Sequence, residues 1–195
     1  MIKAKLKFTY AVMGAGKTAQ MINAYEIYRR KGLKPIVIKP NKDDREGKFN
    51  GWGTTASRLM PNRAVDVYHF SDLEKELPNL DFGSILVDEA QFLTREEVLF
   101  LSELVDKKDI TVLTYGLKTD VNGNLFEGSS TLLALADEVI EMESLCEIPN
   151  CNNKAQLHLR FIDGQPDTNK EAVVIEKDNV TYKSVCRKCW NELGR

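Results

Sequence analysis

The sequence predicts an α/β fold: a doubly wound parallel sheet followed by a small module that carries the cysteines. Two observations lead to this prediction. Short apolar segments alternate with helix-length amphipathic segments up to about residue 144, an order that favours parallel strands joined by right-handed βαβ crossovers. Beyond Ser144 the alternation stops and all four cysteines follow. We therefore expect one domain over residues 1–144 and a second over residues 145–195.

Length, composition and charge limit the class of protein. The 195 residues suffice for one α/β domain with a small appendage. With 43% hydrophobic residues but no apolar run near the roughly 20 residues that cross a bilayer, the chain is predicted to be soluble, with no membrane partner. Residues 1–6 lack the features of a secretory signal, which predicts a cytoplasmic protein with reduced cysteines. A net charge of −2 gives no electrostatic reason to expect nucleic acid as a partner.

The first third of the chain predicts two strands around one helix. Residues 5–10 alternate as a strand does, and residues 17–31 carry apolar side chains at helical spacing before Gly32 and Pro35 stop the pattern. Residues 36–38 read as a buried strand. Residues 40–63 mix glycines and prolines with charges and show no period, which predicts a mobile loop, and long loops in compact domains are often functional.

Three strands and two helices are predicted between residues 65 and 115. Each helix opens with a capping-box signature, a Ser or Thr followed three residues later by Glu. In chain order these elements are a strand at 65–68, a helix from Ser71 with Glu74, a strand at 84–88, a helix from Thr94 with Glu97 to about Lys107, and a strand at 110–115. Ligands of such sheets bind at the carboxyl ends of the strands, so we expect the site there.

A phosphate-binding loop is predicted between the first strand and the first helix. The segment resembles the pattern Gly-x-x-x-x-Gly-Lys-Ser/Thr, with alanine in place of the first glycine. Small residues let backbone N–H groups wrap phosphates, the lysine can reach the β- and γ-phosphates, and the threonine hydroxyl can bind Mg²⁺. A glycine-containing turn with a solvated lysine is the alternative. The residues are Ala11, Val12, Met13, Gly14, Ala15, Gly16, Lys17 and Thr18.

Two adjacent carboxylates, Asp88 and Glu89, end the apolar strand at 84–88. Asp88 is expected to hold Mg²⁺, directly or through water. Glu89 is expected to act as the general base that takes the proton from an alcohol acceptor. The sequence Asp-Glu-Ala-Gln that starts at Asp88 is also typical of a helicase-type ATPase, in which the glutamate orients water. A solvated acidic turn is the simplest alternative.

The cysteines form two close pairs. Cys146 and Cys151 are separated by four residues, Cys186 and Cys189 by two, and 34 residues lie between the pairs. This spacing is typical of a closed tetrahedral zinc site, although four unrelated thiols are an alternative. His158 lies in a short alternating run and is interpreted as a surface or core imidazole rather than a ligand.

These motifs resemble those of the type II thymidine kinases, which contain zinc and a phosphate loop. The resemblance extends to residues 115–120, 123–126, 173–175 and 184–189. The resemblance covers nearly the whole chain. It implies a P-loop, RecA-like sheet with a zinc-binding lasso domain. The implied reaction moves the γ-phosphate of ATP to the 5′-hydroxyl of thymidine, giving dTMP in nucleotide salvage, with deoxyuridine as a further acceptor. Zn²⁺ would be structural, and Mg²⁺ would accompany ATP at Thr18 and Asp88.

The resemblance also implies roles for single residues. By this resemblance, the segment between the cysteine pairs would form a lasso that closes over thymine, whereas a buried strand is the simpler interpretation of residues 173–175. Val121 departs from the aromatic that many relatives carry, and Glu176 and Lys177 stand where relatives often carry glycines. The nucleoside residues would be Met13, Phe92, Leu117, Val121, Phe126, Val174, Ile175 and Tyr182, and Asp43, Arg45 and Gln91 would join the phosphate loop and Asp88 around ATP.

Direct in-line transfer is the mechanism that these residues predict, with Lys17, Mg²⁺ and Arg45 offsetting negative charge while Glu89 removes the acceptor's proton. Family resemblance further implies a homotetramer and feedback inhibition by thymidine triphosphate (dTTP). Two rival interpretations remain: a nucleic-acid-stimulated ATPase, and a zinc-ribbon interaction module with a decayed nucleotide site.

Overall fold

The structure is a computed structural model, and it describes residues 3–40, 53–57, 60–71, 73, 81–167 and 179–194. Seven strands form the main sheet in the order β3-β4-β2-β5-β6-β1-β7, and every neighbouring pair is parallel except β3 with β4. The strands are β1 (Leu6–Tyr10), β2 (Pro35–Lys39), β3 (Gly53–Ser57), β4 (Met60–His69), β5 (Ser84–Val87), β6 (Thr111–Gly116) and β7 (Glu138–Glu141).

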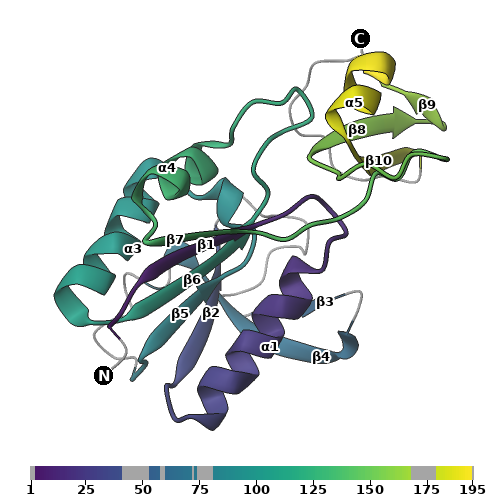
Figure 1. The fold of residues 1–195 in the computed structure, drawn as a ribbon. Coiled ribbons are helices and arrows are strands. Elements are labelled where there is room, and N and C mark those ends of the chain that lie inside the picture. The colour runs from purple at the N-terminus through teal and green to yellow at the C-terminus, as the bar shows by residue number, and fades with distance from the viewer. Residues whose placement is uncertain are drawn as a thin grey trace.

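Helices cover both faces of this sheet (Figure 1). Helix α1 (Lys17–Arg30) packs on one face, and α3 (Arg95–Lys108) with α4 (Glu127–Leu135) packs on the other. Strand β5 shows why both faces need cover: Ile85 and Val87 join the cluster beneath α3 and α4, whereas Leu86 joins the cluster beneath α1. A fully apolar strand is expected where both faces are buried. The predicted doubly wound α/β fold is confirmed.

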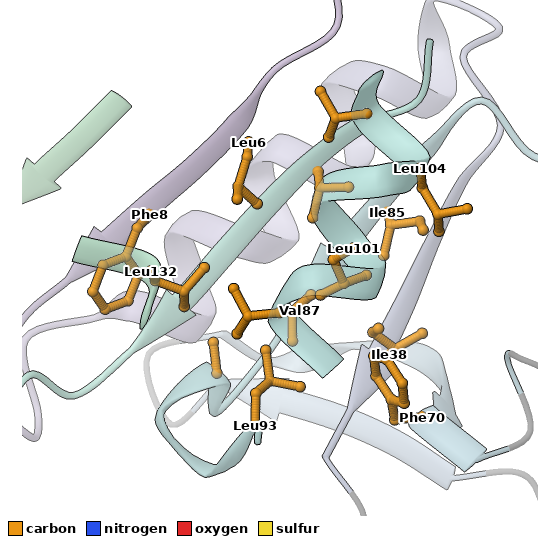
Figure 2. Packing of buried hydrophobic residues seen from close by; sticks show 14 of the residues in the cluster. Leu6, Phe8, Ile38, Phe70, Ile85, Val87, Leu93, Leu101, Leu104 and Leu132 are labelled. Atoms are coloured by element: carbon orange, nitrogen blue, oxygen red, sulfur yellow. The ribbon is translucent and has the colours of Figure 1, made fainter. Parts of the chain in front are cut away.

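The larger hydrophobic cluster lies between the sheet and helices α3 and α4 (Figure 2). Leu101 from α3 and Leu132 from α4 meet Phe8 and Val87 from the sheet, and all four side chains are fully buried. Burying each such side chain stabilises the fold by about 1.5–3 kcal/mol. This packing gives the loops at the carboxyl ends of the strands a rigid base.

The capping box at the start of α3 forms as predicted. The Thr94 hydroxyl accepts a hydrogen bond from the Glu97 N–H at 3.2 Å, and the Glu97 carboxylate accepts one from the Thr94 N–H at 2.8 Å. Two of the donors that a helix N-terminus leaves unpaired are thereby satisfied. Ser71 lies in a helical turn after β4, while its proposed partner Glu74 lies outside the described residues.

The prediction of a mobile loop over residues 40–63 is wrong where the structure describes it. Residues 53–57 form β3, and β4 begins at Met60, so the two strands make an antiparallel hairpin on the edge of β2. The glycine and proline content suggested a loop, but Gly53 lies in the edge strand β3 and Pro61 lies beside the register shift at Ser57, two places where a sheet tolerates these residues. Residues 41–52, 58 and 59 lie outside the description.

The cysteine module is a separate three-stranded antiparallel sheet in the order β10-β8-β9, followed by α5 (Arg187–Leu193). Its strands are β8 (Leu157–Ile162), β9 (Gln165–Pro166) and β10 (Val180–Val185). A small core of Leu159, Phe161 and Val185 packs against the four cysteines. Figure 1 places the module beyond the carboxyl ends of β1 and β6. Within the described part of the chain, no helix is both long and apolar enough to cross a membrane.

Candidate active site

The phosphate loop runs from the end of β1 to Thr18, the second residue of α1. Gly14 and Gly16 have φ of 72° and 86°, a left-handed backbone that glycine adopts without steric cost. Ala11 is not among the residues with positive φ, so its methyl group fits where the motif usually has glycine. Apart from Gly14 and its two chain neighbours, no heavy atom of the described residues lies within 4 Å of the position that a Gly14 Cβ would take.

Lys17 and Thr18 link the phosphate loop to its surroundings. The Lys17 ammonium donates to the Val12 carbonyl at 2.9 Å, inside the loop. The Thr18 hydroxyl donates to Asp88 Oδ1 at 3.4 Å, although β6 separates β1 from β5 in the sheet. The structure therefore brings the phosphate loop and the acidic strand end together at one edge of the sheet.

Glu89 is held in place by its neighbours. It has a left-handed backbone, with φ of 54°, and its N–H donates to Asp88 Oδ1 at 3.1 Å. Asp88 itself is buried. The Gln91 side-chain amide donates to Glu89 Oε2 at 2.6 Å and accepts from the Leu117 N–H at 2.9 Å. Gln91, which the sequence analysis assigned to ATP, is thus placed between the carboxylate of Glu89 and the segment after β6.

An aromatic pair stands beside this segment. The rings of Phe92 and Phe126 meet edge to face, with centroids 5.7 Å apart and planes at 73°. Apolar aromatic faces of this kind cover the face of a flat ligand well. Both residues were assigned to the nucleoside from the sequence, and the structure brings the two together.

The other candidate residues fall into three groups. Val121 lies at the base of the cysteine module, where its carbonyl accepts from the Trp190 indole at 2.9 Å. Tyr182 lies on β10 opposite Arg160, and the two side chains are hydrogen-bonded. Four candidates, Asp43, Arg45, Val174 and Ile175, lie outside the described residues, as do Glu176 and Lys177.

Two residues of the cysteine module reach the phosphate loop, and the sequence analysis missed both. His158 Nε2 accepts from the Met13 N–H at 2.9 Å, and the Ser184 hydroxyl donates to the Met13 carbonyl at 2.8 Å. Burial, followed by the charge of Lys17, lowers the pKa of His158 from 6.5 to about 4, so the imidazole is neutral and can accept. The alternating run around His158 predicted its strand, but only tertiary packing shows that it touches the loop.

The four cysteines meet in one cluster. Their sulfur atoms all lie within 4.8 Å of one another, and the Cys151 sulfur is 3.7 Å from both Cys186 and Cys189. A disulfide needs about 2.05 Å, whereas four sulfurs at 2.3 Å around one tetrahedral ion stand about 3.8 Å apart. The Cys189 N–H, at the start of α5, donates to Cys186 Sγ and lowers the pKa of that thiol to about 6. The donor set and spacing fit a metal ion such as zinc.

Comparisons with known proteins agree with this geometry. A family model described as "Thymidine kinase" matches residues 4–190. A protein of Salmonella paratyphi A named thymidine kinase is 38% identical over 97% of this chain and 91% of its own length. The thymidine kinase of Enterobacteria phage T4 is 38% identical over 98% of both chains, and that of Legionella pneumophila is 39% identical over 94% of this chain and 88% of its own.

Proposed function

The chain belongs to the thymidine kinase family, and from that premise we propose that it transfers the γ-phosphate of ATP to the 5′-hydroxyl of thymidine. The observation that carries this proposal is the contact between Thr18 and Asp88. It sets the phosphate loop beside a carboxylate pair whose second member, Glu89, is oriented by Gln91. A kinase needs this juxtaposition of a triphosphate cradle and a base.

In the proposed reaction Glu89 accepts the proton of the acceptor hydroxyl as its oxygen attacks the γ-phosphorus and ADP leaves. Lys17 leaves the Val12 carbonyl and follows the charge of the β- and γ-phosphates. Transfer is direct and in line, so no covalent intermediate on the chain is required. Arg45 and Asp43 are proposed near the phosphates from the family resemblance.

Two metal sites belong to the proposal. Thr18 and Asp88 would hold Mg²⁺, which neutralises charge on the β- and γ-phosphates when it is bound with ATP. Cys146, Cys151, Cys186 and Cys189 would hold Zn²⁺ in a closed structural site remote from the reaction. The spacing of the four sulfurs supports the second assignment.

The nucleoside is proposed to bind between the two domains, taken as residues 1–144 and 145–195. Phe92 and Phe126 would cover thymine, next to Leu117, whose N–H is held by Gln91. Val174, Ile175 and Tyr182 would close over the base as a lid and exclude water from the transferred phosphate. A lid that reads the polar edge of the base with main-chain groups would also admit deoxyuridine.

Incubation of the purified protein with γ-labelled ATP and each deoxynucleoside, with and without DNA, tests the proposal. Transfer of label to thymidine is expected, and DNA-dependent release of phosphate without transfer would instead identify an ATPase. Glu89→Gln should keep ATP binding and lower kcat by about 10²–10⁴. Glu96→Gln, at an exposed position in the first turn of α3, is the matched control and should retain the wild-type kcat.

Family membership also supports proposals about assembly and regulation. We propose a cytoplasmic homotetramer that is inhibited by dTTP. Light scattering should then give a mass close to that of four 22.1 kDa chains. Addition of dTTP should lower the rate of transfer to thymidine. A monomer in solution, or a rate that dTTP leaves unchanged, would contradict the corresponding part of this proposal.

A further inference from the structure

The cysteine module forms two hydrogen bonds with one residue of the phosphate loop, Met13, one to its backbone N–H and one to its carbonyl. The Met13 N–H donates to His158 Nε2 at 2.9 Å, and the Met13 carbonyl accepts from the Ser184 hydroxyl at 2.8 Å. His158 and Ser184 are opposite each other in the β8–β10 pairing, and at most 3% of either residue is exposed. Two buried side chains of one small sheet therefore hold one residue of the loop.

These two bonds fix two successive peptide planes. In a trans peptide unit the N–H and the carbonyl point to opposite sides. Because the Met13 N–H faces His158, the Val12 carbonyl of the same unit faces away, where it accepts from Lys17 Nζ at 2.9 Å. Because the Met13 carbonyl faces Ser184, the N–H of Gly14 points away from the module. The two hydrogen bonds to Met13 thus determine both the direction of the Val12 carbonyl, which Lys17 contacts, and the direction of the Gly14 N–H.

Ser184 and His158 are themselves held by further hydrogen bonds. The Ser184 N–H donates to the Glu147 carboxylate, and the Glu147 N–H donates back to the Ser184 carbonyl at 2.9 Å. His158 is also hydrogen-bonded to the backbone of Thr119. The His158 ring cannot turn away from Met13 without breaking its bond to Thr119, and the two backbone bonds to Glu147 fix the position of Ser184.

We propose that His158 and Ser184 are positioning residues for the phosphate loop, through which the cysteine module sets the affinity for ATP. The inference rests on the proposed function, because it assumes that this loop binds the triphosphate. Backbone donors bind an anion well when they already point toward it before it arrives. Without the hydrogen bonds with His158 and Ser184, the peptide units on both sides of Met13 can rotate, and ATP must then order them as it binds. The module would therefore serve the ATP side of the reaction as well as the nucleoside side.

Binding of Mg²⁺–ATP to the metal-loaded protein, measured by titration calorimetry, tests the proposal. His158→Leu introduces an apolar side chain of similar bulk and removes the acceptor, and it should weaken ATP binding about tenfold. His158→Gln offers an amide oxygen near the position of Nε2 and should restore most of that affinity. Trp190→Phe is the matched control, since it removes a partly buried side-chain hydrogen bond between the module and Val121 without touching Met13. Its ATP affinity should stay within about twofold of the wild type.

The melting temperature separates positioning from a general loss of stability. His158→Leu loses the hydrogen bonds to Met13 and Thr119, and Trp190→Phe loses the one to Val121, so both variants should melt at lowered temperatures. Only His158→Leu should lose ATP affinity and raise the KM for ATP. Ser184→Ala removes the hydrogen bond to the Met13 carbonyl and should also weaken ATP binding. This second variant tests the proposal even if His158→Leu does not fold. Unchanged ATP affinity in these variants, or an equal loss in Trp190→Phe, would overturn this inference alone. Wild-type protein without ATP affinity would overturn the proposed function as well.

Discussion

Acid should weaken the fold through His158, by an amount that follows from its surroundings. The imidazole is 3% exposed and accepts a hydrogen bond from Met13 through Nε2, a role that only the neutral form can fill. Burial and the charge of Lys17 lower its pKa from 6.5 to about 4. The other ionisable groups that face it, across a small pocket, are Tyr10, Lys118 and Glu141.

The sign and the size of the effect follow from this pKa. Between pH 6.5 and about 4 the unfolded chain binds a proton at this residue and the folded chain does not. The stabilisation is therefore complete above pH 6.5 and is lost as the pH falls through the folded pKa. At 1.36 kcal/mol per unit, the shift corresponds to about 3 kcal/mol in the free energy of unfolding.

Urea unfolding followed by tryptophan fluorescence, at pH values from 8 to 4, measures this loss. His158→Gln is the reference chain, because it keeps an acceptor for Met13 and cannot titrate. Both chains keep the same cysteines and carboxylates, so acid effects on those groups cancel in the difference between them. The free energy of unfolding of the wild type should fall by about 3 kcal/mol relative to His158→Gln. A difference that stays constant over this range would refute the assignment of a neutral, hydrogen-bonded His158.

Three further predictions concern the stability of the fold. A Cβ at Gly128 would lie 2.5 Å from the Ala90 carbonyl oxygen, so Gly128→Ala should lower the free energy of unfolding in urea by about 1–3 kcal/mol. Ser130→Ala, at an exposed position of the same helix, is the control and should change it little. Thr94→Ala removes the cap of α3 and should cost about 1 kcal/mol in the same assay, and an unchanged midpoint would contradict the capping geometry. Elemental analysis should find one metal ion per chain, and its removal by a chelator should lower the melting temperature; a metal-free protein with an unchanged melting temperature would contradict the cluster.

Local signals in the sequence predicted the elements that local chemistry determines. The capping pair of Thr94 and Glu97 lies three residues apart, and the phosphate loop is a continuous run between one strand and one helix. Strand β5 could be predicted because a short, fully apolar run has few alternatives in a parallel sheet. The close approach of the two cysteine pairs also followed from spacing, because a single tetrahedral ion needs ligands from both.

Elements that depend on distant partners could not be predicted in the same way. The hairpin of β3 and β4 is held by the pairing of β4 with β2, which the local glycine and proline content of residues 40–63 does not report. Helix α4 opens with Glu-Gly-Ser-Ser-Thr, which are mostly weak helix formers, and its contacts with α3 and the turn at 90–92 hold it in place. The contact of His158 with Met13 spans 145 positions in the chain, and no periodicity reports it.

Gly116 ends β6 against the side chain that orients Glu89. A Cβ added there would lie 2.8 Å from Gln91 Oε1 and 2.9 Å from the Gln91 nitrogen. The two positions are therefore linked in any attempt to redesign this protein. A mutant library that varies residue 116 alone should return only glycine among active clones. Enlarging residue 116 requires a shorter side chain at residue 91, a shift of the backbone nitrogen of residue 91, and a new partner for the Glu89 carboxylate.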